Sequence, residues 1–169
     1  MQISFPEGHV FIDGSWREPL SGDKFESINP ATGQRVIEAA LGGPDDVDLA
    51  VAAARQALKG PRRSIDPSER GRMLYRAAAE IRRRTETLAW LDTSDMGKPI
   101  SDARGNVAGA ANVIEFYAGL ADKIHGTVTP VPGDNFNYVL REPVGVVAAI
   151  TPWNFPVWMV AIKLGPALA

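Results

Sequence analysis

The sequence predicts an α/β protein with short strands, helices and an incomplete parallel sheet. The clearest sign is Val144–Ile150, an apolar run without polar alternation, which is typical of a parallel strand covered on both faces. Between residues 44 and 120 the apolar positions instead recur with helical spacing. From residue 126 the pattern changes to a period of two on either side of Pro132–Asn135, which predicts an antiparallel hairpin.

The N-terminal part is predicted to form short strands. His9–Asp13 and Ser15–Arg17 meet at an Asp-Gly dipeptide, which favours a tight hairpin turn. Two further strands, Phe25–Ile28 and Gln34–Leu41, are separated by an Asn-Pro-Ala-Thr-Gly turn.

Three helices are predicted next. Pro44 suits the first turn of the first helix, the aspartates that follow favour its positive end, and Gly60 ends it. The second helix begins with Asp66 as its cap and with Glu69 placed for a capping box, and its buried stripe extends to Leu91.

Ser101 is expected to cap the third helix, which runs to about Leu120. The spacing of Gly105 and Gly109 within it favours close packing against another helix.

The last part of the chain contains the buried strand Val144–Ile150, a turn, and an apolar helix that we expect to be interrupted at Gly165-Pro166. Such a strand needs partner strands on both sides and helices on both faces. Only one helix follows it, so the chain is expected to be an unfinished α/β domain.

Composition excludes several classes of function. The net charge of −2 gives no electrostatic footprint for nucleic acid or an anionic membrane, so neither partner is expected. No signal peptide or transmembrane run is apparent, and a cytoplasmic location is expected by default. The absence of cysteine excludes disulfides and thiolate metal ligands.

The turn after the apolar run carries one polar side chain between two prolines, Asn154. Ligands of parallel sheets bind beyond the carboxyl ends of strands, and an amide can donate hydrogen bonds to an oxyanion without changing its own charge. The other interpretation is that Asn154 satisfies backbone groups of a Pro-rich turn. Asp92 and Asp95 suggest paired carboxylates, but at this spacing near a helix end they are more often solvated.

Three blocks of sequence resemble the aldehyde dehydrogenase superfamily in order and spacing. They begin at Arg141-Glu142-Pro143-Val144-Gly145, at Pro152-Trp153-Asn154-Phe155-Pro156 and at Lys163-Leu164-Gly165-Pro166. The similarity extends upstream through Asn29–Gly33 and Gly97–Pro99, so it covers nearly the whole chain. It implies the N-terminal portion, about a third, of an NAD(P)-dependent aldehyde dehydrogenase with a Rossmann-type sheet.

The resemblance also implies roles for individual residues. Asn154 would belong to the oxyanion hole, and Asp95 would bind a structural monovalent cation together with backbone oxygens near Ser27 and Ile28. Phe155, Met159 and Ile162 would line the substrate tunnel. The NAD or NADP cofactor would contact Ile150, Thr151, Pro152 and Trp153.

By the same resemblance the chain divides into three parts. Residues 1–125 would be the N-terminal strands and helices of the cofactor-binding domain, 126–142 the oligomerisation hairpin, and 143–169 the first buried strand and following helix of the Rossmann-type core. The complete enzyme would oxidise an aldehyde to a carboxylic acid as a homodimer or homotetramer.

The family uses a cysteine nucleophile, and this chain has no cysteine. We therefore expect the chain to be inactive on its own. The alternative hypothesis is a non-catalytic truncated protein that acts as an association module.

Overall fold

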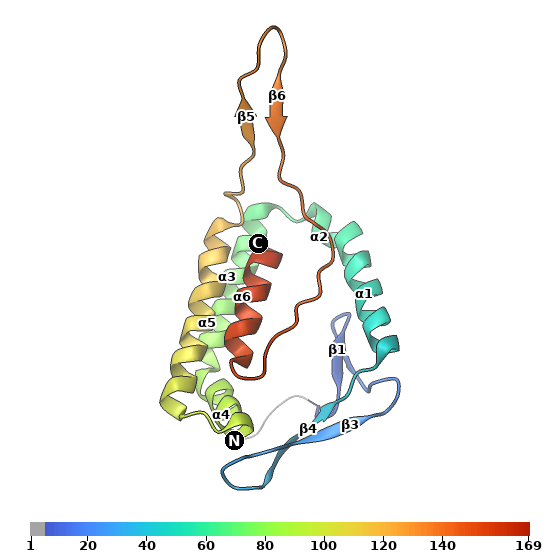
Figure 1. Cartoon of the computed structure of the whole chain (residues 1–169), viewed down its shortest axis with the longest axis vertical. Coiled ribbons are helices and arrows are strands. Elements are labelled where there is room, and N and C mark those ends of the chain that lie inside the picture. The colour runs from blue at the N-terminus through green and yellow to red at the C-terminus, as the bar shows by residue number, and fades with distance from the viewer. Residues whose placement is uncertain (1–5) are drawn as a thin grey trace.

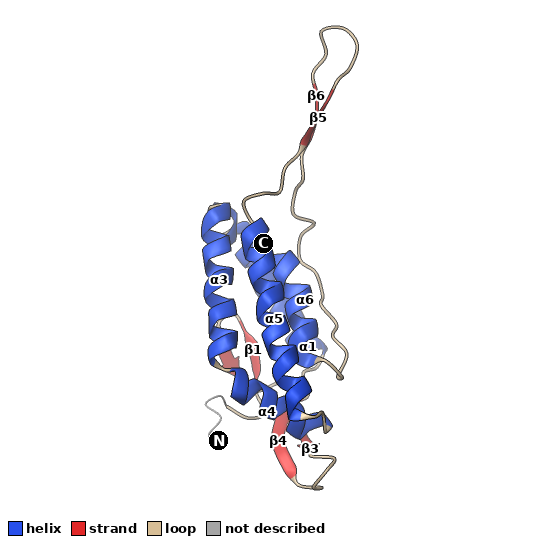
Figure 2. Ribbon diagram, turned by 90° about the vertical axis from the view of Figure 1, so that its left-hand side faces the viewer, coloured by secondary structure: helices blue, strands red, loops and turns tan. Residues whose placement is uncertain are grey.

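The computed structural model describes residues 6–169. Residues 1–5, which the predicted unit 1–125 includes, lie outside the described part. Helices α3, α5 and α6 lie side by side, α4 crosses one end of this group, and the β5–β6 hairpin projects from the other end (Figures 1 and 2). Helix α1 and the N-terminal strands lie to one side of the helical group (Figure 1).

The N-terminal strands form two antiparallel pairs, as predicted. Strands β1 (Val10–Ile12) and β2 (Ser15–Arg17) are joined at Asp13 and Gly14, whose φ angles of 52° and 74° are those of a tight hairpin turn. Strands β3 (Lys24–Ile28) and β4 (Arg35–Ala40) form the second pair, which carries a bulge at its Ser27–Ile28 end.

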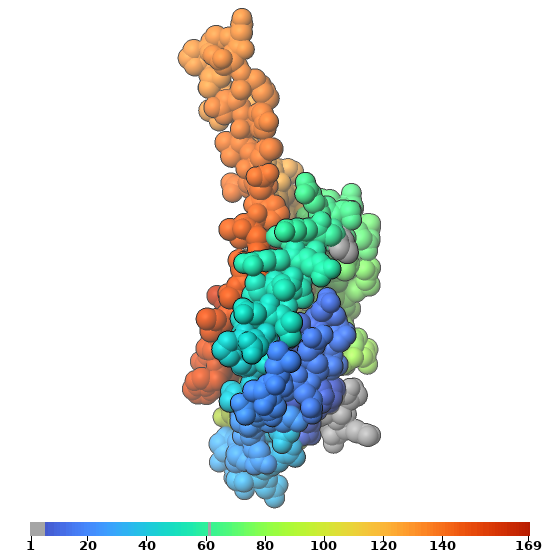
Figure 3. Space-filling view, turned by 90° about the vertical axis from the view of Figure 1, so that its right-hand side faces the viewer, coloured from blue at the N-terminus to red at the C-terminus, as the bar shows by residue number. Residues whose placement is uncertain are grey.

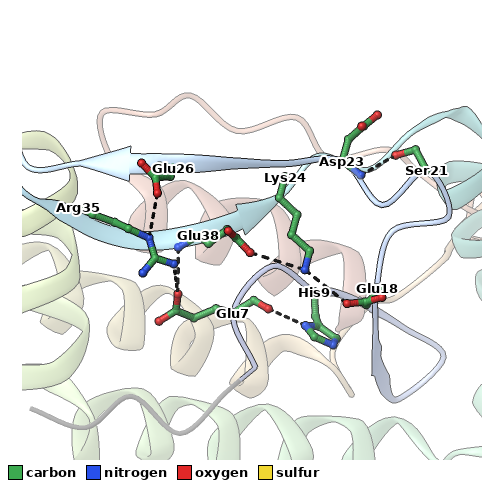
Figure 4. A network of polar contacts seen from close by, with 9 residues as sticks. All are labelled: Glu7, His9, Glu18, Ser21, Asp23, Lys24, Glu26, Arg35 and Glu38. Atoms are coloured by element: carbon green, nitrogen blue, oxygen red, sulfur yellow. Dashed lines mark hydrogen bonds and ion pairs between the residues drawn. The ribbon is translucent and has the colours of Figure 1, made fainter.

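Charged side chains fasten the segment before β1 to the β3–β4 pair (Figure 4). Arg35 binds Glu7 at 2.6 Å and also lies 3.4 Å from Glu26. The Lys24 ammonium lies 3.4 Å from Glu18 and 3.6 Å from Glu38. These pairs are partly exposed, so each contributes little stability. The Arg35–Glu7 pair ties the chain before β1 to the β3–β4 pair, and the Lys24–Glu18 pair ties the residue after β2 to it.

Helix α1 (Pro44–Lys59) begins as predicted, and the buried carboxylate of Asp46 explains why. It accepts hydrogen bonds from the backbone of Gly43 at 2.9 Å and of Leu20 at 3.1 Å, which ties the helix start to the loop between β2 and β3. Most of the helix is solvent-exposed, and it forms a large part of one face of the molecule (Figure 3). The short helix α2 (Pro61–Ser64) follows directly.

The predicted second helix is two helices, α3 (Pro67–Arg83) and α4 (Thr85–Met96). Asp66 caps α3 by accepting from the backbone N–H of Ser68 at 2.8 Å. Glu69 binds Arg72 and Arg76 along the helix rather than closing a capping box. The stripe that continues to Leu91 therefore belongs partly to α4.

Helix α5 (Ile100–Leu120) is the centre of the helical group and contacts α3, α4 and α6. Its N-cap residue is Pro99, and the Ser101 hydroxyl donates to Asp102 inside the first turn, so the prediction that Ser101 caps this helix was wrong. Small side chains let the helices approach closely. The buried cluster comprises Leu74, Ala78, Ala110, Ile114, Ala118, Ala121, Ala161 and Ala169.

The predicted hairpin forms from β5 (Thr127–Thr129) and β6 (Asn137–Val139), paired antiparallel with Val128 opposite Tyr138. Both strands are exposed along their length, and the hairpin extends well clear of the helices (Figure 1). Its large apolar side chains, including Val128 and Tyr138, have solvent around them.

The expected buried strand Val144–Ile150 does not form. The segment is extended but unpaired, and Val144 and Ile150 are 90% and 88% exposed. A parallel strand is held by its neighbours, and no described residue pairs with this segment. The described strands form antiparallel pairs only, so the parallel sheet predicted from this run is absent from residues 6–169.

The last helix, α6 (Pro156–Leu168), runs through Pro166 without the expected interruption. Pro166 lacks the N–H that would donate to the carbonyl of Ile162, but it stands in the final turn, so only two helical residues follow this lost bond. The end of the helix is also held from outside. Arg62 donates to the carbonyls of Ala167 and Leu168 at 3.1 and 3.2 Å, and Arg70 donates to that of Ala169 at 2.9 Å. Within residues 6–169, the helices are too short or too polar to cross a membrane.

Candidate functional site

The candidate site is the turn at residues 152–155, which joins the extended segment to α6. Phe155 is the N-cap residue of α6 and Pro156 occupies its first turn. Asn154 is exposed, and its side-chain amide makes no hydrogen bond to any residue in the described range. The amide is therefore available to a ligand, and it does not satisfy backbone groups of the turn.

Lys98 fixes this turn from the opposite side. Its ammonium group donates to the backbone carbonyl of Asn154 at 2.9 Å and lies 4.3 Å from the centroid of the Phe155 ring. The same group lies 3.9 Å from the carboxylate of Asp92 in α4. Two successive residues of the turn are thus held by one buried cation.

Asp92 is only 4% exposed, so the expectation that it is solvated was wrong. It is buried because α4 turns it inward toward Lys98 and away from water. Desolvation raises the pKa of the Asp92 carboxyl, an effect that the nearby Lys98 opposes and that Asp95 reinforces. One oxygen of Asp92 has no hydrogen-bond partner among the described residues.

Asp95 is exposed and accepts a hydrogen bond from the hydroxyl of Ser27. The fold therefore brings Asp95 beside Ser27 and Ile28, the residues with which a cation site was predicted. Within residues 6–169, side chains of His, Cys, Asp and Glu nowhere gather as a group of three or more that could hold a metal ion by themselves.

A cavity of about 460 Å³ lies between the N-terminal strands and helices α4 and α6. Asp92 and Asp95 contribute to its walls, which are otherwise largely apolar. Asn154 does not line this cavity.

The residues predicted to contact the cofactor lie in the extended segment and the turn. Ile150 is 88% exposed and Trp153 is 78% exposed, whereas Thr151 is half-buried and Pro152 is exposed. They form an open apolar surface directly before Asn154.

The three predicted tunnel residues share one side of α6 by their helical spacing, but they do not meet in one cavity. Ile162 lines a cavity of about 420 Å³ between α5 and α6 together with Trp158, Tyr117 and Phe116. Phe155 and Met159 do not line it. Phe155 instead stacks beneath Lys98.

Sequence reasoning missed the part played by Lys98 and Asp92. The available signal was Gly97-Lys98-Pro99, a lysine whose backbone is restricted by the proline that follows it. Nothing in that pattern indicates that the lysine reaches a turn more than fifty residues later.

Comparison with known proteins relates the sequence and the fold to one family. The model described as "Aldehyde dehydrogenase family" matches residues 16–169. An aldehyde dehydrogenase of Aspergillus niger is 44% identical over 160 residues, which are 95% of this chain and 32% of that protein. A mitochondrial aldehyde dehydrogenase of Rattus norvegicus is 45% identical over 163 residues, with coverages of 95% and 31%.

A solved structure of the P. syringae indole-3-acetaldehyde dehydrogenase AldA, in complex with NAD+ and IAA, superposes with a TM-score of 0.91 at 39% identity. The match covers 98% of this chain and 34% of that one. The chain spans about a third of the length of the relatives it matches. The predicted fold class, the N-terminal part of an aldehyde dehydrogenase-like fold, is thereby confirmed. This chain belongs to the aldehyde dehydrogenase family.

Proposed function

We propose that this chain provides the oxyanion-binding and part of the cofactor-binding region of an NAD(P)-dependent aldehyde dehydrogenase, with Asn154 as the oxyanion donor. One observation carries the proposal. The amide of Asn154 is exposed and has no hydrogen-bond partner in the described chain, while its backbone is fastened by Lys98. A fixed backbone with a free amide is the arrangement that a preorganised donor requires.

The chemistry follows from the charge that develops on an aldehyde. When a nucleophile adds to the carbonyl carbon, the carbonyl oxygen becomes an oxyanion, and a neutral N–H donor stabilises this charge more than it stabilises the aldehyde. Asn154 would make that bond. Because the chain contains no cysteine, the thiol nucleophile that the family uses would come from outside residues 1–169.

The open surface formed by Ile150–Trp153 fits one side of a dinucleotide. Its side chains are apolar or carry a hydroxyl, and its extended backbone leaves N–H and C=O groups unpaired within the described residues. NAD(P), when bound, accepts the hydride that leaves the substrate carbon. The P. syringae relative was solved with NAD+, which supports the proposal.

Phe155, Met159 and Ile162 are proposed to contact the aldehyde's side chain from α6. Phe155 adjoins Asn154 in sequence, so an aldehyde whose oxygen meets the Asn154 amide would place its carbon chain near that ring. This ring is held in place by Lys98.

The test is a spliced enzyme in which this chain replaces the matched region of the P. syringae dehydrogenase, joined within the shared segment after Lys163. We expect NADH formation from indole-3-acetaldehyde, and none from the 169-residue chain alone. Asn154→Ala should lower kcat on the order of 10²–10³-fold, the usual cost of losing one oxyanion donor. Gln56→Ala, which removes an exposed amide from α1, is the control. A kcat for Asn154→Ala within threefold of the parent would return Asn154 to the role of a turn residue.

A monovalent cation is proposed to bind beside Asp95. Its carboxylate is close to the Ser27 hydroxyl, and the bulge of the β3–β4 pair at this point breaks the regular pairing of backbone carbonyls. A hard cation would be held by such oxygen ligands. Potassium chloride should then raise the melting temperature above its value in choline chloride at equal ionic strength, and Asp95→Asn should abolish the difference.

We propose that the β5–β6 hairpin, residues 126–142, joins subunits into a homodimer or homotetramer. Its exposed apolar side chains on both strands support this role. The same surface is the observation that favours the second candidate function, an association module without catalysis. The spliced enzyme distinguishes these two functions. If the chain is only an association module, the enzyme should oligomerise and its kcat should not change on Asn154→Ala. A cytoplasmic location stays a prediction, and the R. norvegicus relative is named as mitochondrial.

A further inference from the structure

Lys98 occupies a backbone position with little freedom. Gly97 ends α4 in the left-handed conformation with φ of 76°, and Pro99, with φ of −55°, is the N-cap residue of α5. The proline ring restricts the backbone conformation of Lys98, and the left-handed turn at Gly97 sets the direction in which the chain leaves α4. The junction between two packed helices therefore aims this side chain.

Three contacts converge on the Lys98 ammonium group. It donates to the carbonyl oxygen of Asn154 at 2.9 Å, lies 4.3 Å from the Phe155 ring centroid, and lies 3.9 Å from an Asp92 oxygen. The first contact orients the peptide group that follows Asn154. The second fixes the residue that starts α6.

Burial makes these contacts specific. The Lys98 side chain is only 10% exposed, so its charge has few alternative partners in water. A buried ammonium group that loses a hydrogen bond suffers a large penalty, which disfavours any movement of the turn away from it. Asp92 is buried more deeply and balances the charge, but its distance from Lys98 is too long for a direct hydrogen bond. The directional bond of Lys98 is therefore the one to Asn154.

We propose that Lys98, balanced by Asp92, is a positioning residue that holds the Asn154–Phe155 turn in the orientation needed for oxyanion binding. Lys98 does not touch the substrate and acts through the backbone of Asn154. The catalytic part of this inference rests on the proposed function, whereas the anchoring of the turn does not.

The first measurement uses the full chain and two-dimensional NMR of its amide groups. Lys98→Met keeps the length of the side chain and removes the charge and the donor. We expect it to shift the resonances of the Asn154 side-chain amide and the Phe155 backbone amide while leaving those of Ala78 and Ala110 in the core unchanged. Lys98→Arg, which keeps the charge, should restore much of the parent spectrum. Lys123→Met, at an exposed lysine paired with Asp122, is the matched control.

If Lys98→Met unfolds the chain, Phe155→Leu removes the ring contact and leaves Lys98 in place. It should shift the Asn154 amide resonances in the same direction by a smaller amount. Unchanged Asn154 and Phe155 resonances in a folded Lys98→Met protein, or unchanged Asn154 resonances in a folded Phe155→Leu protein, would overturn the proposal.

The second measurement uses the spliced enzyme. Lys98→Met should lower kcat about 10- to 100-fold with KM little changed, the cost of misplacing a catalytic group, and Lys98→Arg should recover most of the loss. A normal kcat for Lys98→Met alongside a reduced kcat for Asn154→Ala would overturn the positioning role. A normal kcat for Asn154→Ala would instead refute the oxyanion role, and the NMR result alone would then decide whether Lys98 anchors the turn.

Discussion

The indole ring of Trp158 in α6 lies directly against Gly109 in α5, so that a Cβ atom added at Gly109 would stand 1.8 Å from Cζ3 of the ring. Helix α6 is therefore seated on α5 at a point where only a hydrogen atom fits. Since α6 begins two residues after Asn154, this contact also helps to fix the position of the Asn154 turn relative to α5.

Gly109→Ala should destabilise the fold by about 1–3 kcal/mol, because the indole ring must move or α6 must shift outward. The control is Gly105→Ala in the same helix, where an added Cβ meets nothing within 4 Å. That change should stabilise the chain by up to about 1 kcal/mol through helix propensity. Urea unfolding of both variants measures the contrast, and equal effects of the two would show that the Trp158 contact is not rigid.

Asp66→Ala should cost about 1 kcal/mol, because the N–H of Ser68 loses its acceptor at the start of α3. Asp66→Asn retains a side-chain oxygen at the same position and should cost much less. Thermal unfolding followed by circular dichroism compares the two. Equal losses of stability in the Ala and Asn variants would mean that the negative charge of Asp66, rather than its hydrogen bond with Ser68, stabilises the start of α3.

Glu80 makes stability depend on pH. Hydrogen bonds from Arg83 and Arg84 lower the pKa of Glu80 from its usual 4.5 to about 2. The folded state thus binds its proton less readily than the unfolded state does, so the stabilisation is complete above the unfolded pKa and is lost as pH falls from about 4.5 to about 2. Glu80→Gln should flatten the loss of stability across this range, as measured by urea unfolding at several pH values. The control is Glu26→Gln, and an acid response unchanged by Glu80→Gln would contradict the assignment.

Val144 and Ile150 should promote self-association of the chain, since both are almost fully exposed in an unpaired extended segment. Val144→Lys with Ile150→Lys should raise the concentration at which the chain remains monomeric in sedimentation experiments. Neither side chain contributes to the core, so the melting temperature should change little. If association is unaltered, self-association would instead involve the exposed side chains of the β5–β6 hairpin, such as Phe136 and Leu140.

Local signals in the sequence were sufficient for most elements. The Asp13-Gly14 turn, the Asp66 cap and the turn between β5 and β6 each depend on a few neighbouring residues, and each prediction is confirmed. Val144–Ile150 failed because its strand character depends on partners that residues 6–169 do not supply. Local chemistry also misassigned the cap of α5, because the helix begins at Ile100, ahead of Ser101, and its N-cap residue is Pro99, which has no side-chain acceptor.

The candidate site was predictable only in part. Asn154 could be selected because it is the single polar side chain in an apolar turn. Lys98 could not, because its contact with that turn joins residues 56 positions apart and depends on how α4, α5 and α6 pack. The burial of Asp92 also depends on how the helices pack. It was not predicted because the residues around Asp92 in the sequence resemble an exposed helix end.

The arginine contacts to the end of α6 bear on the order in which the chain folds. Arg62 and Arg70 reach carbonyls that lie 99 to 106 residues later in sequence. Closing a loop of this length costs more chain entropy than forming the nearby pairs β1–β2 and β5–β6, and such distant contacts slow folding. We therefore expect the terminal helix to dock after α3 and α5 have paired, so that the Asn154 turn would acquire its final shape in that step.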